Sequence, residues 1–356
     1  MPPAPVLAAK AYVLYDYTSN QMLVSQNGHD RLAPAGLTKI MTAYLALNAV
    51  RQHQFLMTQQ AYPSLAALRP QDDEARMFLD HNKAVTVDEL LHGLVIPSGD
   101  DAARVLVDLI SGDEATFAGL MNRQAQALGM RDTHFVNATG KPDPQHYSSA
   151  YDLVLLSAAM LRDFPQAYAL YGQHEYQYQD MKLFNNNRLL WNDPYVDGIK
   201  IGHNEGAGYC LAASAERDNR RLISIVLGAA SDSLRDSESQ KLLNYGFRYF
   251  ETMPLYQKNE AVGTLRVWKG AARTVNVGFP SGLSLTVPKG TLPRFKATME
   301  SHQPIIAPIT VGQQLGVLRL SLNDKAYAEF PLVALEAVPV SNVFARGWDS
   351  IRLFFQ

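Results

Sequence analysis

Apolar residues at the start of the chain occur in two short runs with a polar break between them. Residues 11–17 (AYVLYDY) and 22–25 (MLVS) flank a turn-forming segment, and this pattern predicts a β-hairpin. From residue 37 to residue 47, apolar side chains recur at helical spacing and predict a buried helix. The chain also predicts further helices at 87–96, 100–111, 114–128 and 150–162.

Two later apolar runs, 209–215 and 222–227, are joined by the charged segment 216–219, which indicates a pair of antiparallel strands. Residues 232–251 then return to a helical pattern. Strands first, helices in the middle, strands again and a closing helix are typical of an antiparallel sheet with helices packed on its faces. We therefore expect an α+β fold for residues 1–254.

Beyond about residue 255, the pattern changes to short apolar runs interrupted by Gly and Pro. The runs lie at 263–268, 274–277 and 283–287. They predict a small all-β sandwich domain over residues 255–340. A length of 356 residues exceeds that of one typical domain, so a large domain with a smaller companion fits the chain.

The final segment, residues 341–356, has the pattern of an amphipathic helix. Its large apolar side chains recur at i, i+4, i+7 and i+11 and share one helical face: Phe344, Trp348, Ile351 and Phe355. Such a face either packs on a protein core or lies on a membrane surface. Because the segment follows a complete domain, we favour binding to a membrane surface.

Composition limits the partners and cofactors. A formal net charge of −2 provides no basic field for phosphate contacts, so we expect no nucleic-acid partner. The single cysteine, Cys210, excludes an internal disulfide and a Cys-rich metal site, and we expect neither a metal nor a cofactor. The first residues lack the basic and apolar regions of a signal peptide, so we expect none in this chain.

Three short segments correspond in order to the S-x-x-K, S-x-N and K-T-G motifs of serine acyl-transfer enzymes of the β-lactamase and penicillin-binding type. They are residues 36–39 (GLTK), 98–100 (SGD) and 200–202 (KIG). Each segment alone is a weak signal, because such short patterns arise by chance. Three of them in this order, each on a suitable helix, loop or strand, are much more specific.

The residues that match these motifs have clear chemical roles. Residues three apart on a helix share a face, so the amine of Lys39 can approach a side chain at position 36 and deprotonate a serine there. Ser98 can relay a proton to the leaving amine. Lys200 supplies positive charge on a sheet-edge strand that can pair with an extended peptide.

Three positions depart from the motifs. Gly36 stands where the nucleophilic serine is expected, so no acyl-enzyme can form there. Asp100 replaces the asparagine of the second motif with a group that only accepts hydrogen bonds. Ile201 replaces the threonine of the third motif and removes a hydroxyl group. Successive side chains on a helix are rotated by about 100°, so the side chain of Thr38 points in a different direction from those at its neighbouring positions. We therefore do not expect Thr38 to act as a substitute nucleophile.

Over essentially its whole length, the chain resembles the D-alanyl-D-alanine carboxypeptidases. Beyond the three motifs, the resemblance rests on Tyr15-Asp16-Tyr17, 128–135 (LGMRDTHF), 147–150 (YSSA), 189–191 (LLW) and 239–250 (SQKLLNYGFRYF). It implies a β-lactamase/transpeptidase-like domain, a β-rich C-terminal domain and an amphipathic membrane-anchoring helix. It also implies the bacterial periplasm, removal of the terminal D-Ala from peptidoglycan pentapeptide, and acylation by β-lactams.

The same resemblance assigns three further residues to substrate binding. Arg235 falls where the family has an arginine for the substrate's terminal carboxylate, and its planar guanidinium suits that role. Gly202 and His203 continue the third motif, and we expect His203 to be a hydrogen-bonded wall of the site.

The sequence leaves several functions open. We expect an inactive homologue, attached to the inner membrane through residues 341–356, that binds stem peptides ending in D-Ala-D-Ala and β-lactams non-covalently at most. The alternatives are an active hydrolase of the same fold and a membrane-associated scaffold without ligand binding. A class A β-lactamase has no reason to carry the C-terminal β domain. Whether the three departures are natural or engineered stays open.

Overall fold

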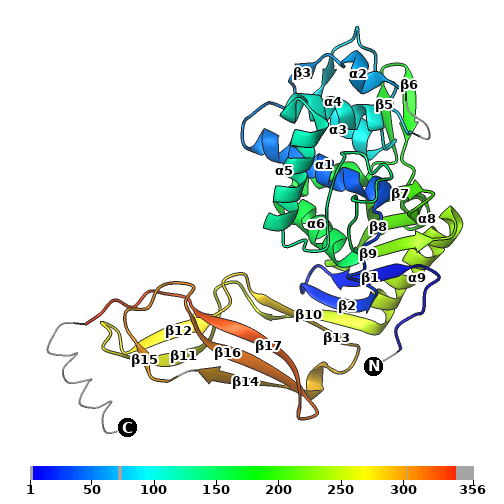
Figure 1. The fold of residues 1–356 in the computed structure, drawn as a ribbon. Helices are drawn as coiled ribbons and strands as arrows, with labels where there is room; N and C mark the ends of the chain where they lie inside the picture. The colour runs from blue at the N-terminus through cyan, green and yellow to red at the C-terminus, as the bar shows by residue number, and fades with distance from the viewer. Residues whose placement is uncertain (1–2, 71–73, 302, 342–356) are drawn as a thin grey trace. The chain divides into compact units, whose positions relative to one another are not determined.

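The computed structural model describes residues 3–70, 74–301 and 303–341 (Figure 1). By its internal contacts, the chain divides into two compact units, Pro3–Arg248 and a second unit that begins at Tyr249. The C-terminal segment 342–356, for which we expect an amphipathic helix, lies outside the described residues.

The first unit is built around a five-stranded sheet of order β2-β1-β9-β8-β7, in which every neighbouring pair is antiparallel. The strands are β1 (Ala11–Asp16), β2 (Gln21–Gln26), β7 (Val196–Asn204), β8 (Gly208–Arg217) and β9 (Arg220–Ala229). Asp218 and Asn219 join β8 to β9 with φ angles of 52° and 61°, the left-handed conformation that tight hairpin turns require. Both predicted strand pairs are confirmed.

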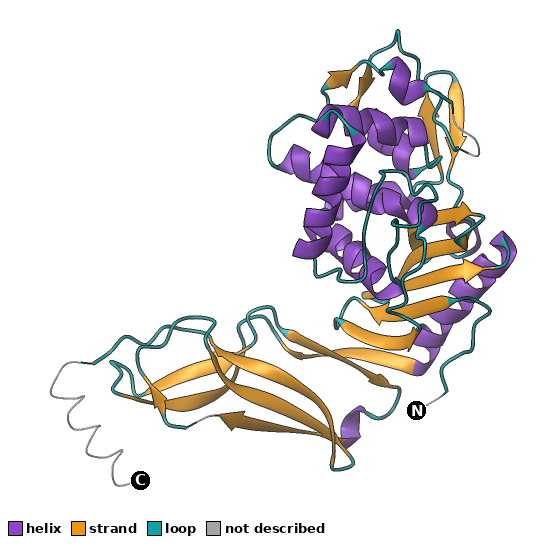
Figure 2. Cartoon of the chain, in the orientation of Figure 1, coloured by secondary structure: helices purple, strands orange, loops and turns teal. Residues whose placement is uncertain are grey.

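Helices cover both faces of this sheet (Figure 2). On one face, Val13 and Ile225 join a buried core with the apolar residues of α1 and α6. On the other face, Gly246 of α9 lies against Leu14 and Leu222. The main helices are α1 (Lys39–Arg51), α3 (Val87–Val95), α4 (Asp100–Ser111), α5 (Glu114–Ala127), α6 (Ala150–Asp163) and α9 (Asp232–Tyr249). The predicted α+β fold is confirmed.

The first predicted helix differs from the structure at its start. Residues Ala35–Thr38 form a short 3-10 turn, η1, and the α-helix begins only at Lys39. The backbone of Ala35 has φ +47°, outside the helical region, so a regular helix cannot run through this point. Position 36 therefore lies in the turn that precedes the helix.

Local capping fixes several of the other helix starts. Thr86 and Glu89 form a capping box at the start of α3. Asp113 accepts from the backbone N–H of Thr116 in α5, and Ser149 accepts from Asp152 in α6. Each such cap stabilises its helix by about 1 kcal/mol. Smaller elements complete the unit: β3 (Gln60–Ala61), α2 (Leu65–Leu68), β4 (Val85–Thr86), α7 (Pro165–Tyr168), η2 (Ala169–Gly172), β5 (Glu175–Tyr178), β6 (Met181–Phe184) and α8 (Leu189–Asn192).

The second unit is a β domain with its own core. Its main sheet has the order β14-β16-β17-β12-β11-β15, and β10 pairs with β13 in a separate two-stranded sheet. Leu285 and Val287 of β13 are buried together with Val277 of β12 and Leu318 of β16, so the two sheets share one core. The strands are β10 (Phe250–Tyr256), β11 (Ala261–Trp268), β12 (Thr274–Gly278), β13 (Leu283–Pro288), β14 (Phe295–Ser301), β15 (Ile305–Ile306), β16 (Gln314–Leu322) and β17 (Lys325–Ala334), with a short turn η3 (Leu292–Arg294).

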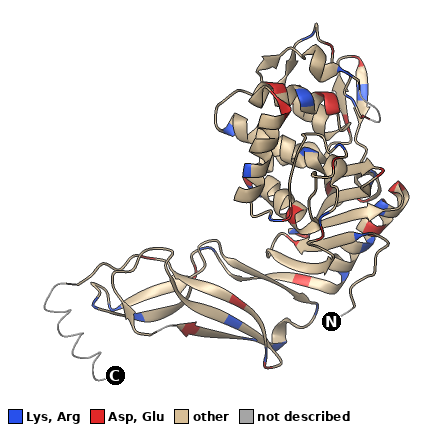
Figure 3. Ribbon diagram, in the orientation of Figure 1, with Lys and Arg blue, Asp and Glu red and all other residues tan. Residues whose placement is uncertain are grey.

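The predicted boundary after residue 254 lies inside β10, which pairs with β13 of the second unit. Charged residues of both signs are interspersed along the described chain (Figure 3). Among the described residues, no helix is long and apolar enough to cross a membrane.

Candidate active site

The first and third motifs meet where the turn η1 packs against the edge strand β7. A Cβ atom added at Gly36 would lie only 2.9 Å from the carbonyl oxygen of Ile201 and 3.2 Å from the Cα of Gly202. A Cβ added at Gly202 would lie 2.6 Å from the backbone nitrogen of Gly36. The two backbones therefore touch directly, and tertiary packing places position 36 against the third motif.

The site is built on backbone in unusual conformations. Ala35, immediately before Gly36, has φ +47°, and Ser98 of the second motif has φ +68°. Left-handed conformations of this kind in non-glycine residues cost about 1–3 kcal/mol each and persist where the surroundings enforce them. Gly140 packs directly against the first of these residues: it has φ +91°, and a Cβ there would lie 1.8 Å from the carbonyl oxygen of Ala35. Only glycine fits at that position.

Lys39 and Asp100 form a buried ion pair. The Lys39 Nζ lies 2.7 Å from Asp100 Oδ1, and the two side chains are only 6% and 9% exposed. The Lys39 amine also donates to the carbonyl oxygen of Thr139 at 3.2 Å. The acid that replaces the expected asparagine therefore directly engages the lysine of the first motif.

Lys200 is buried beside this pair. Its amine donates to the carbonyl oxygen of Val95 at 2.8 Å, and the residue is 3% exposed. Burial holds the pKa of Lys200 well below its usual range; the nearby charge of Lys39 lowers it further, and Asp100 acts in the opposite direction. Two lysines and one carboxylate thus share a poorly solvated space.

The second motif is fixed by an acid that the sequence analysis did not single out. Asp101 is fully buried and accepts from the backbone N–H groups of Met77 at 3.0 Å and Leu79 at 3.2 Å. The N–H of Asp100 donates to the carbonyl oxygen of Ala75. These bonds tie the segment 75–79 to the start of α4. The adjacent acids at the start of the predicted helix were the only signal available in the sequence.

Thr38 belongs to a buried hydrogen-bond chain. Its Oγ1 lies 2.8 Å from His146 Nε2, and the N–H of Val136 donates to His146 Nδ1 at 3.1 Å. Because Nδ1 accepts, Nε2 carries the proton and donates to Thr38. Burial lowers the pKa of His146 to about 4, so the imidazole is neutral at pH 7. Thr38 is fully buried, and this role agrees with the prediction that it is no substitute nucleophile.

The remaining predicted substrate-binding residues lie in different surroundings. Ile201 pairs with Leu211, so strand alternation places it on the sheet face that α9 covers, opposite to Lys200 and Gly202. Arg235 of α9 is 3% exposed and ion-paired with Asp236 Oδ1 at 2.7 Å. The guanidinium of Arg235 is thus engaged by its neighbour. His203 is exposed, and its ring stacks on Tyr209 with the centroids 4.0 Å apart.

The first unit thus holds position 36 against the edge strand of a helix-covered antiparallel sheet, with Lys39 three residues further on, which is the spacing of the S-x-x-K motif of serine acyl transferases that recognise β-lactams. The family model described as D-alanyl-D-alanine carboxypeptidase matches residues 1–231. The model described as penicillin-binding protein 5, C-terminal domain, matches residues 250–340. The chain belongs to the D-alanyl-D-alanine carboxypeptidase family.

Individual relatives agree with this assignment. The D-alanyl-D-alanine carboxypeptidase DacC of Escherichia coli is 38% identical over 99% of this chain and 90% of its own length. The crystal structure of penicillin-binding protein 5 from Haemophilus influenzae has a TM-score of 0.91 at 36% identity and covers 95% of this chain and 100% of its own. A penicillin-binding protein of Listeria monocytogenes, solved in its ampicillin-bound form, has a TM-score of 0.63 at 31% identity and covers 69% of this chain and 100% of its own.

Proposed function

We propose that this protein is a member of the carboxypeptidase family that has lost acyl transfer and binds D-Ala-D-Ala stem peptides or β-lactams non-covalently at most. One observation carries the proposal. Position 36 is a glycine, so no hydroxyl is available at the place where the turn η1 meets β7. Without an oxygen nucleophile, neither a peptide nor a β-lactam can be converted into an ester there.

The surroundings of Gly36 support the loss of chemistry. Thr38 is buried in its bond to His146, so it cannot reach a substrate without rebuilding the core. The Lys39 amine is held by the Asp100 carboxylate at 2.7 Å and by the carbonyl oxygen of Thr139 at 3.2 Å, and the carboxylate is a partner that the asparagine of the family motif does not supply. Because of these two features, the site differs from that of an active family member by more than the missing hydroxyl at position 36.

Some binding capacity remains in this arrangement. β7 is the last strand of its sheet, so its outer backbone groups can pair with an extended peptide. The charge of Lys200 attracts a carboxylate only to the extent that the buried amine stays protonated. We therefore expect weak binding of D-Ala-D-Ala peptides without turnover.

The test is the mass of the intact protein after incubation with benzylpenicillin, with DacC of Escherichia coli as the positive control. We expect an adduct on the control and an unchanged mass for this chain. The companion assay measures release of D-alanine from a pentapeptide. A stoichiometric adduct, or D-alanine release at the 1 to 10³ per second typical of enzymes, would establish the active hydrolase instead.

We also propose that the protein acts in the bacterial periplasm and attaches peripherally to the inner membrane through residues 341–356. The sequence pattern of the segment supports this, since four large apolar side chains share one face. Arg346 and Arg352 are partly offset by Asp349, so binding to anionic vesicles should be only mildly salt-sensitive. Deleting the segment should abolish vesicle binding. Equal binding by the truncated chain would rule the attachment out.

A further inference from the structure

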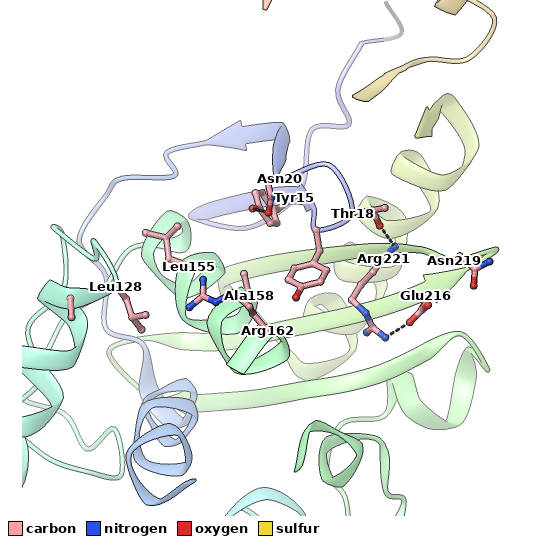
Figure 4. A pocket seen from close by; sticks show the side chains of 12 residues that line it. Tyr15, Thr18, Asn20, Leu128, Leu155, Ala158, Arg162, Glu216, Asn219 and Arg221 are labelled. Atoms are coloured by element: carbon pink, nitrogen blue, oxygen red, sulfur yellow. Dashed lines mark hydrogen bonds and ion pairs between the residues drawn. The ribbon is translucent and has the colours of Figure 1, made fainter. Parts of the chain in front are cut away.

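The first unit also contains a cavity that is separate from the motif site, and none of its lining residues belongs to the three motifs (Figure 4). We call it the second cavity. Its volume is about 740 Å³, within the range of about 300–1,000 Å³ that is typical of small-molecule sites. It is formed by the end of β1 and the following turn, the end of α5, the side of α6 and the turn between β8 and β9. Four chain segments that are far apart in sequence thus converge on one hollow.

One part of the wall is apolar and aromatic. Leu128, Leu155 and Ala158 line it from the helices. Tyr15 and Tyr17 line it from the end of β1. Rings and methyl groups of this kind favour a ligand with flat apolar surfaces of its own.

The other part is polar, and each of its two arginines is paired with acids. Arg221 donates from Nη1 to Asp197 Oδ1 at 2.8 Å and pairs through Nη2 with Glu216. Arg162 donates to both carboxylate oxygens of Asp163, at 2.8 and 2.9 Å. Both arginines are therefore already matched by acids. The two guanidinium groups are paired with three carboxylates, so a phosphate or carboxylate ligand would meet an excess of negative charge, and the cavity suits an uncharged polar ligand.

Several side chains are also held in place for further hydrogen bonds. The Tyr15 hydroxyl donates to Asn20 Oδ1 at 3.0 Å, which orients that amide so that its Nδ2 can donate to a ligand. The N–H of Arg221 donates to Thr18 Oγ1 at 2.9 Å, and the N–H of Tyr17 donates to the Arg221 carbonyl at 3.0 Å. These bonds fix the turn after β1 to the start of β9, so the polar wall is rigid before any ligand arrives.

We propose that this cavity binds an uncharged N-acetylated oligosaccharide. A pyranose ring has an apolar C–H face that suits the tyrosine rings, and hydroxyl groups that both donate and accept. Amide, guanidinium and carboxylate groups on the rim can pair with those hydroxyls, and the acetyl methyl group suits the leucine wall. The site would hold a glycan independently of any chemistry at Gly36.

The experiment is a calorimetric titration of the full chain with chitotetraose, a β-1,4-linked N-acetylglucosamine tetramer. We expect saturable binding that Tyr17→Ala weakens by at least about tenfold, because the aromatic surface is lost. Arg162→Ala, at an exposed side chain that should not affect folding, is expected to weaken it severalfold. Tyr62→Ala, at a tyrosine that is 70% exposed and does not line the cavity, is the matched control and should bind like the parent.

Circular dichroism of each variant separates loss of binding from loss of fold. The proposal is overturned if the parent chain shows no heat of binding, or if folded Tyr17→Ala and Arg162→Ala both bind with unchanged affinity. Maltotetraose, which lacks acetyl groups, should bind at least several times more weakly. Equal binding of the two tetrasaccharides would overturn the assignment of an N-acetylated ligand.

Discussion

Two ion pairs of the same chemical kind lie in very different surroundings in this protein. Lys39 and Asp100, at the motif site, have side chains that are 6% and 9% exposed. Arg162, which lines the second cavity, and its partner Asp163 have side chains that are 61% and 18% exposed. In the first case both charges have lost their water and depend on each other, whereas in the second case solvent screens the pair. Burial, and not the identity of the charged groups, decides which pair the fold depends on.

Removing one member of the buried pair should have the largest effect on stability. Lys39→Met leaves the Asp100 carboxylate buried without its cation, and we expect unfolding free energy to fall by about 3–5 kcal/mol. The double variant Lys39→Met/Asp100→Leu removes both charges and should recover most of that loss. Urea denaturation of the parent, single and double variants measures this coupling. Equal losses in the single and double variants would show that the unpaired Asp100 carboxylate is not what destabilises Lys39→Met.

The buried imidazole of His146, which is bonded to Thr38 near the same site, should make stability depend on pH. Its pKa of about 4 in the fold lies below the ordinary value of about 6.5, so the unfolded chain binds the proton more readily. The contribution of neutral His146 to the free energy of unfolding is fully present above about pH 6.5. It is lost as pH falls from about 6.5 to about 4, by at most about 3 kcal/mol. His146→Gln keeps the donor and the acceptor but does not titrate. The difference in melting behaviour between parent and variant should therefore change across this window, and a constant difference would contradict the assignment.

Restoring a side chain at position 36 should cost a moderate amount of stability. The added Cβ would meet backbone atoms of Ile201 and Gly202 that cannot rotate away, so Gly36→Ser and Gly36→Ala should each lower stability by about 1–3 kcal/mol. Only the serine variant can be acylated, and we expect a slow, partial penicillin adduct on it. The alanine variant is the matched control for the steric effect. A serine variant as stable as the parent would show that β7 moves away from η1 easily.

The exposed pair should show the smallest effect. Arg162→Ala should change unfolding free energy by no more than about 0.5–1 kcal/mol, because the Arg162 side chain is 61% exposed and solvent screens its charge. The same urea series used for Lys39→Met provides the measurement. A loss comparable with that of Lys39→Met would remove the contrast between buried and exposed pairs.

The amino-acid pattern by itself determined the elements and the motifs. Alternating and helical spacings marked the strands and main helices, because they report which side of each element is buried. The order of the segments at 36–39, 98–100 and 200–202 was sufficient to predict the family. The glycine at position 36 can be read directly from the sequence.

Only the tertiary structure decided how those residues interact. Thr38 and His146 are 108 positions apart, and no local pattern links them. The contact between Gly36 and the backbone of Ile201 likewise depends on packing. The second cavity lies between turns and helices whose sequences show no shared signal. Local periodicity encodes burial, whereas distances between remote side chains are set by the way the sheet and helices close around one core.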